Sequence, residues 1–162
     1  MVGMRILRGA LGPQARSSEK PSGSSILEID SWMPSRIQAI SPLVDRLMLL
    51  IEGSQCIPGE EPDVELALRE ALANAVVHGN GRGQIKVHIR CRSGPGNEIS
   101  IVVTDQGKGS DFRNVPGDGE TSKPAGEHAH GIELMKAYMD DVYFERGGAE
   151  VHMRKRARKS WH

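Results

Sequence analysis

The chain has 162 residues, with 21 basic and 21 acidic side chains and therefore a formal net charge of zero. This length suits one domain with a single hydrophobic core, and the balanced charge favours neither nucleic acid nor an anionic membrane as a partner. The two cysteines, Cys56 and Cys91, form no CxxC pair, so neither a structural zinc site nor a disulfide framework is predicted. The chain shows neither a long apolar run nor a secretory signal, and we expect a soluble cytoplasmic protein.

Composition divides the chain into three parts. Residues 1–24 hold glycine, proline and serine without a sustained period and are predicted to form a flexible N-terminal segment. Residues 25–157 carry the periodic segments of a folded domain. Residues 158–162 end a locally basic run, which is expected to be a solvated tail rather than a partner-binding patch.

The first periodic segments predict a strand, a helix and a loop. Residues 26–30 are a short candidate strand, and apolar residues between 37 and 51 recur at helical spacing. Pro42 lies inside that stripe, where it either kinks the helix or marks its first turn. Residues 56–63 contain two prolines and a glycine and read as a loop.

The next segment predicts an amphipathic helix with an unusual polar row. Its apolar stripe leaves Glu70, Asn74 and His78 at strict four-residue intervals on another face. Asparagine has weak helix propensity, so the position of Asn74 among good helix formers needs an explanation. The pair Glu70 and Asn74 is either a satisfied buried amide beside a solvated carboxylate or part of a site.

A hairpin and a glycine-containing turn follow. Residues 85–91 alternate apolar and polar, a turn lies at 93–97, and 98–104 returns as a buried strand that stops at Asp105. With Gly107 and Gly109 behind it, Asp105 can accept a hydrogen bond from an exocyclic amine while a flat base lies against the glycines. The same pattern also occurs as an ordinary turn after a strand.

The remaining segments predict a loop, a helix and two strands. Residues 106–127 are polar, rich in glycine and proline and without a period, as in a functional lid or a disordered loop. A helix is expected at about 131–139, followed by strands at 142–145 and 150–154 that are joined at Gly147 and Gly148.

These motifs together resemble a known family. The run from Glu70 to Gly79, the sequence Asp105-Gln106-Gly107-Lys108-Gly109 and the run from His130 to Met135 are similar, in this order, to the N-box and the two glycine boxes of the GHKL-type (Bergerat fold) ATP-binding domain. Within that group, which includes gyrase and histidine kinases, the chain looks most like the bacterial anti-sigma factor serine/threonine kinases. The resemblance covers about residues 26–156.

The resemblance implies a fold, a cofactor and residue roles. The fold would be α+β, a two-layer sandwich of a mixed, mostly antiparallel sheet with helices packed on one face. The cofactors would be ATP and Mg²⁺, with Asn74 as the metal ligand and Glu70 as the general base that activates a protein hydroxyl. Asp105, Gly107 and Gly109 would bind adenine, and backbone amides at His130, Gly131 and Ile132 would bind the phosphates.

Two histidine positions leave alternatives open. The second glycine box usually carries an arginine where this chain has His130, which is only partly charged at neutral pH and predicts a weaker grip on the phosphates. Glu127, His128 and His130 suggest a metal cluster, but they lack a fourth partner, and a histidine pair in a lid near phosphates is favoured. His78 either caps the helix end or contributes to the nucleotide site.

The partners follow from the resemblance alone. They would be an anti-anti-sigma (STAS-type) protein that carries the target Ser or Thr, a competing sigma factor and a second copy of the chain in a homodimer, with no direct contact to nucleic acid or membrane. One rival hypothesis is an ATP-binding regulatory module that sequesters a partner without phosphoryl transfer. Another is a detached histidine-kinase catalytic domain, which would need a phosphoacceptor histidine on a helical dimerisation segment.

Overall fold

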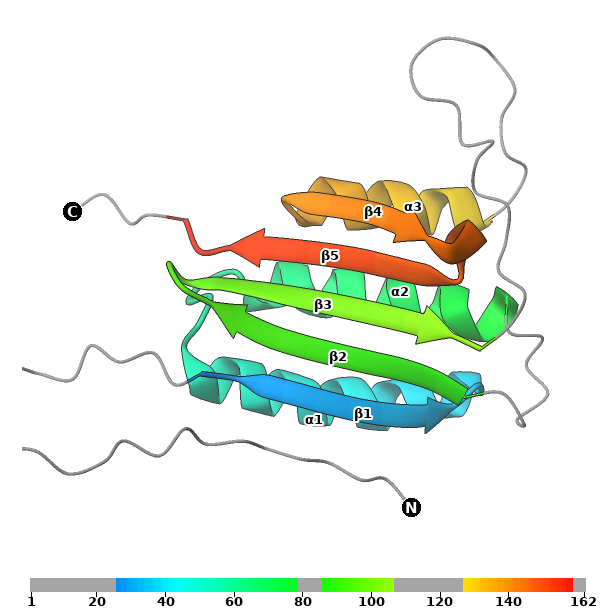
Figure 1. Ribbon diagram of the computed structural model, residues 1–162, viewed down its shortest axis with the longest axis horizontal. Helices are drawn as coiled ribbons and strands as arrows, with labels where there is room; N and C mark the ends of the chain where they lie inside the picture. The colour runs from blue at the N-terminus through cyan, green and yellow to red at the C-terminus, as the bar shows by residue number, and fades with distance from the viewer. Residues whose placement is uncertain (1–25, 79–85, 107–126, 159–162) are drawn as a thin grey trace, which may run out of the picture.

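The computed structural model describes residues 26–78, 86–106 and 127–158 (Figure 1). Their elements, in chain order, are β1 (Glu28–Pro34), a 3₁₀ turn (Ile37–Ala39), α1 (Ile40–Ser54), α2 (Glu61–His78), β2 (Lys86–Gly94), β3 (Glu98–Asp105), α3 (Glu127–Tyr138), β4 (Asp141–Glu145), a 3₁₀ turn (Arg146–Gly148) and β5 (Glu150–Arg156). No helix among these residues is long and apolar enough to cross a membrane.

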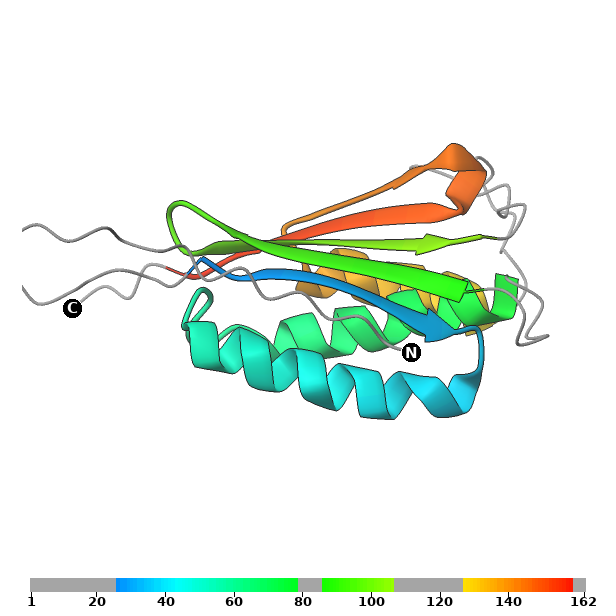
Figure 2. The same cartoon turned by 60° about the horizontal axis from the view of Figure 1, so that its bottom comes forward.

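The strands form one five-stranded sheet in the order β1-β2-β3-β5-β4. All the pairings recorded between these strands are antiparallel, with His88 opposite Thr104 and Thr104 opposite Glu150. The helices α1, α2 and α3 lie together against one face of the sheet, and no α-helix of the described residues covers the other face (Figure 2). The predicted α+β architecture, with helices packed on one face, is therefore confirmed.

The hydrophobic core fills the space between the two layers. Strand residues at alternate positions face inward, such as Ile89 on β2 and Ile101 on β3, both without measurable exposure. Leu68 and Leu72 of α2 are equally buried and meet them from the helix layer. Because α2 lies between α1 and α3 and also contacts β3, its inward side is buried, and a polar residue on that side needs a hydrogen-bond partner.

Some element boundaries differ from the sequence expectation. Strand β1 runs to Pro34 rather than residue 30. The sequence pattern missed the rest of the strand because Ser31, a buried polar residue, interrupts the apolar inward-facing positions. Helix α2 begins at Glu61, inside the expected loop, with Pro62 in its first turn, where proline removes no hydrogen bond. Pro42 likewise lies in the first turn of α1 rather than at a kink.

Helix α3 begins at Glu127, earlier than the expected start at residue 131. The expected lid lies outside the described residues, apart from its two end residues, Gln106 and Glu127. The β4 and β5 strands occur where they were predicted, and Gly147 in the turn between them has a φ of 65°, a conformation that favours glycine.

Candidate nucleotide site

The polar row on α2 lies beneath the sheet near one end of the helix layer. Asn74 is 8% exposed, and Glu70, one turn earlier, is partly exposed. Among the described residues, the Asn74 side-chain amide nitrogen is the buried side-chain nitrogen or oxygen that lacks a hydrogen-bond partner. An unsatisfied buried amide costs about 1–3 kcal/mol, so this asparagine weakens the folded protein unless a ligand completes its bonds.

Helix α3 passes close to the Glu70 and Asn74 side chains at Gly131. A Cβ added to Gly131 would lie 2.7 Å from Glu70 Oε2 and 3.6 Å from both Asn74 side-chain termini. The absence of a side chain at residue 131 therefore lets α3 approach the carboxylate and the amide closely. Two segments that are far apart in the sequence, the run from Glu70 to Gly79 and the run from His130 to Met135, thus meet in space.

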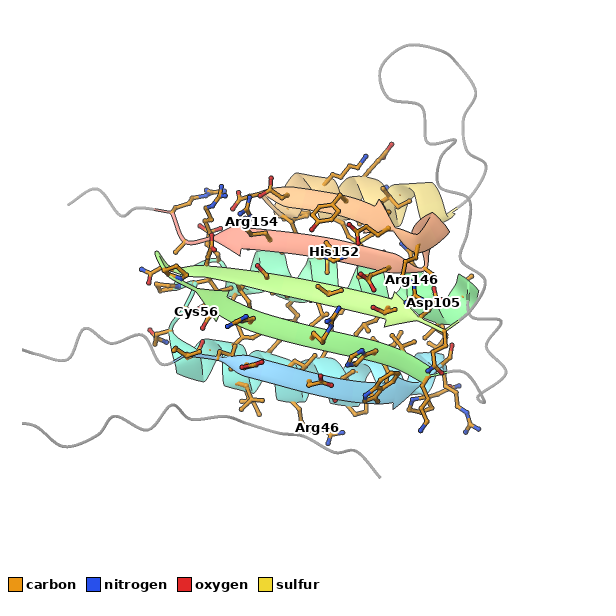
Figure 3. All side chains as sticks on the ribbon, viewed as in Figure 1. Arg46, Cys56, Asp105, Arg146, His152 and Arg154 are labelled. Carbon is orange, nitrogen blue, oxygen red and sulfur yellow. The ribbon has the colours of Figure 1, made fainter. Side chains whose placement is uncertain are left out.

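Asp105 is the last residue of β3 (Figure 3). Its residue is 4% exposed, and its backbone N–H donates to the Ala149 carbonyl across 2.8 Å. Asp105 and Asn74 line one pocket together, as the sequence motifs required of a shared site. The rest of the pocket wall is mostly apolar and comprises Ala71, Ala75, Val103, Met135, Phe144, Gly148, Ala149 and Val151.

Part of this wall was missed by sequence reasoning. Met135 follows Gly131 by one helical turn and is fully buried, so helical spacing from the glycine could have indicated it. Phe144 and Ala71 give no comparable signal. Phe144 reaches the pocket only because the β4–β5 hairpin folds back beside β3, a long-range pairing that periodicity does not encode.

The other predicted site residues are placed less completely. Ile132 is 3% exposed and belongs to the core, while His130 is exposed in the first turn of α3. Since α3 begins at Glu127, the backbone N–H groups of residues 127–129 have no intrahelical partner, and those of Gly131 and Ile132 lie inside the helix. His78 is the last residue of α2, but its side chain lies outside the described part, as do Gly107 and Gly109. The same holds for the side chains of Glu127 and His128, so the metal cluster considered with His130 is not described.

The residue types around this pocket are suited to a purine nucleotide and a metal ion. The pocket offers an apolar wall, a carboxylate that can accept from an amine and an amide with unused hydrogen-bonding capacity. The volume of this pocket is about 20 Å³, room for a single water, so a base needs more space than the described residues leave here. Asn74 Oδ1 is the atom that would hold Mg²⁺, and the ion would neutralise phosphate charge.

An antiparallel sheet with helices on one face defines an α+β sandwich, and the carboxylate at a strand end and the asparagine on the facing helix make its pocket a candidate nucleotide site. Comparison with known families gives the same assignment in more detail. Residues 33–155 match the histidine kinase-like ATPase domain, and the chain belongs to this family.

Similar proteins of this kind occur in clostridia. An anti-sigma F factor of Clostridium botulinum (strain Eklund 17B / Type B) is 33% identical over 105 residues, which cover 60% of this chain and 71% of that protein. An anti-sigma F factor of Clostridium perfringens (strain SM101 / Type A) is 36% identical over 104 residues, which cover 60% of this chain and 73% of that protein.

Proposed function

We propose that the chain is an anti-sigma factor with serine/threonine kinase activity. In this proposal it binds Mg-ATP, transfers the γ-phosphoryl group to an anti-anti-sigma (STAS-type) protein and holds a sigma factor in competition with that protein. The family match and the clostridial relatives named as anti-sigma F factors support the class. The observation that carries the activity is the meeting of Glu70, Asn74 and Gly131 beside the pocket that Asp105 lines.

The residues around Asn74 supply positioning and proton transfer. Phosphoryl transfer depends mostly on alignment and charge neutralisation, so a buried amide with spare capacity beside a carboxylate is a suitable arrangement. Glu70 lies one helical turn before Asn74 and directly under Gly131, where it can accept the proton of a Ser or Thr hydroxyl. A positioned base of this kind contributes about 10²–10⁴-fold to the rate.

The two ends of the nucleotide have separate partners. Asp105 would accept a hydrogen bond from the adenine amine. Gly107 and Gly109, which follow it in the sequence, would lie along the base. The start of α3 would turn its free backbone amides toward the phosphates, with His130 as the nearby side chain and Gly131 leaving room for approach.

The alternative is an ATP-binding module that sequesters a partner without phosphoryl transfer. The exposed His130 favours it, because the residue stands where the resembling kinases carry a permanently charged arginine. A weaker hold on the γ-phosphate reduces transfer more than it reduces binding of the nucleotide or of a partner protein.

One experiment separates the two functions. The full chain is incubated with Mg²⁺ and γ-labelled ATP, together with purified STAS-type and sigma-factor proteins from the same genome, and both label transfer and complex formation are measured. Label on a Ser or Thr of the STAS-type protein supports the kinase. A stable, ATP-dependent complex without label supports the sequestering module, and the absence of both contradicts the assignment to either class.

A further inference from the structure

The helix-free face of the sheet carries a cluster of metal-binding side chains that the nucleotide site does not use. On β5 the residues Val151, Met153 and Lys155 are buried toward the helices, so Glu150 and His152 point to the opposite face. Glu145 of β4 pairs with Glu150 in the antiparallel register, which places it diagonally across from His152. Figure 3 shows His152 on β5 and Asp105 at the end of β3.

The three side chains converge closely. His152 Nε2 lies 2.7 Å from Glu150 Oε1 and 3.3 Å from Glu145 Oε2. One ligating atom from each residue falls within 4.8 Å of the others. Tetrahedral ligands at 2.0–2.2 Å from a zinc ion lie roughly 3.4 Å apart, so an ion fits after the Glu150–His152 contact widens by less than about 1 Å.

Neighbouring side chains already orient two of the three ligands. Thr104 Oγ1 donates to Glu150 Oε2 at 2.9 Å, which leaves Oε1 of the same carboxylate facing His152. Tyr143 stacks on the imidazole with ring centroids 4.6 Å apart and an angle of 6° between the planes. Partners that fix a ligand's orientation in this way are a regular part of metal centres.

Charge and exposure also suit an exchangeable cation. The side chains of Glu150 and His152 are 12% and 20% exposed, whereas Glu145 is 55% exposed at the rim. Arg146 is a competing cation, because its guanidinium lies 4.0 Å from Glu150 Oε2, but its side chain is 67% exposed and can turn toward solvent. Glu150 lines a polar groove of about 430 Å³ together with Thr104, Asp105 and Arg146, so solvent reaches this ligand from the groove.

We propose that Glu145, Glu150 and His152 form a site for a transition-metal ion of the zinc type, with three protein ligands and one position open to water. A mixed nitrogen and oxygen donor set favours Zn²⁺ over Mg²⁺, which prefers six oxygens. The site uses none of the residues assigned to the nucleotide, although Glu150 and Asp105 line the same groove.

The same sheet face provides an internal control. His88 Nε2 contacts Asp30 at 2.8 Å and stacks on Trp32 with centroids 4.0 Å apart, so it has an aromatic neighbour and a carboxylate just as His152 has. It lacks the second carboxylate, because no other His, Cys, Asp or Glu of the described residues completes a group of three there. Of these two histidines, His152 is therefore the one with enough neighbouring ligands to bind an ion.

Zinc binding by the full chain, without nucleotide, tests the proposal by calorimetry, and Co²⁺ substitution reports the coordination number by its visible spectrum. We expect one Zn²⁺ per chain, a tetrahedral Co²⁺ spectrum and little response to Mg²⁺. His152→Ala and Glu145→Gln should abolish binding, Thr104→Val should weaken it about 10-fold, and Arg146→Gln should strengthen it. His88→Ala should bind like the unmodified chain.

Three results would overturn the proposal. They are no zinc uptake at all, equal uptake by His152→Ala and the unmodified chain, and a loss of uptake in His88→Ala instead. A double variant, His128→Ala with His130→Ala, checks the histidines near α3, and loss of zinc there together with retention in His152→Ala would place the ion elsewhere. Circular dichroism of each variant separates lost ligands from lost folding.

Discussion

At the scale of single residues, Asn74 is unfavourable for the stability of the fold but well placed to bind a ligand. Its amide nitrogen is buried without a partner on a helix whose other inward residues are apolar. Residues retained for a ligand are typically those that the folded chain alone does not satisfy. Asn74 and Glu70 should therefore separate stability from function when they are substituted.

We expect Asn74→Ala to lose Mg-ATP binding while its free energy of unfolding, measured without nucleotide, stays within about 1 kcal/mol of the unmodified chain or rises, because an unsatisfied amide is removed. Glu70→Gln should bind Mg-ATP normally and lose phosphoryl transfer. Urea unfolding and calorimetry with ATP provide the measurements. Destabilisation of Asn74→Ala by more than about 2 kcal/mol would mean that the amide has a structural role, and undiminished transfer by Glu70→Gln would remove the base assignment.

Asp105 has a separate consequence for base selectivity. A carboxylate only accepts hydrogen bonds and so matches the amine of adenine, whereas an asparagine in its place can also donate to the carbonyl oxygen of guanine. Asp105→Asn should therefore weaken ATP binding more than GTP binding. Competition titrations with both nucleotides measure the ratio, and an equal loss for the two would contradict a role in reading the base.

At the scale of elements, the approach of α3 to α2 depends on one glycine. The atom that a Cβ at residue 131 would meet is Glu70 Oε2, the end of a flexible side chain that can move aside at small cost in stability. The same movement displaces the proposed base, and misplacement by about 1 Å can cost about 10²-fold in rate.

Gly131→Ala should therefore fold with a free energy of unfolding close to that of the unmodified chain but lose most of the phosphoryl transfer. Gly53→Ala is the matched control, because Gly53 lies in α1 with no atom within 4 Å of the added Cβ. That control should gain up to about 1 kcal/mol from helix propensity and keep its activity. Full transfer activity in Gly131→Ala would show that close contact between these helices does not position Glu70.

The elements also show which parts of the fold sequence patterns can predict and which they cannot. The helix that carries Glu70 and Asn74, the hairpin that ends at Asp105 and the order of strands after it follow from periodicity and turn residues. Buried Ser31 interrupted the apolar pattern of β1, and the close approach of Glu70 to Gly131 is a contact between two helices that the sequence pattern does not contain. Phe144 and Ala149 in the pocket wall depend on the pairing of β3 with β5, a contact between distant segments that local propensity does not specify.

At the scale of the whole molecule, Lys155 of β5 joins three elements near the end of the sheet opposite the nucleotide site. Its Nζ lies 2.8 Å from Asp63 Oδ2 and 3.1 Å from Glu60 Oε2, at the start of α2. It also donates to the Tyr138 carbonyl, at the end of α3, across 2.6 Å. The Lys155 side chain is 5% exposed and that of Glu60 is 8% exposed, so both charges depend on each other for solvation.

These contacts also set the titration of the lysine. Burial opposes the charged form of Lys155, but hydrogen bonds and attraction from Asp63 and Glu60 outweigh it and raise the pKa above the ordinary 10.5. A raised folded-state pKa stabilises the protein fully below the unfolded pKa, and this stabilisation is lost as pH rises through the folded pKa. The tie between the strand and the two helices is thus intact at neutral pH and weakens only above about pH 10.5.

Lys155→Met should lower the free energy of unfolding at pH 7 by about 3–5 kcal/mol, because the buried Glu60 carboxylate loses the closer of its two cations among the described residues and keeps the exposed Arg158. Its matched control is Lys136→Met, on the exposed side of α3, which should change stability by no more than about 0.5 kcal/mol. Adding Glu60→Gln to Lys155→Met should restore part of the loss. Urea unfolding from pH 7 to 11 should show the unmodified chain and the Lys136 variant losing stability at the alkaline end, with a flatter profile for Lys155→Met. Equal slopes in all three proteins would mean that this buried lysine does not link β5 to the helices through its charge.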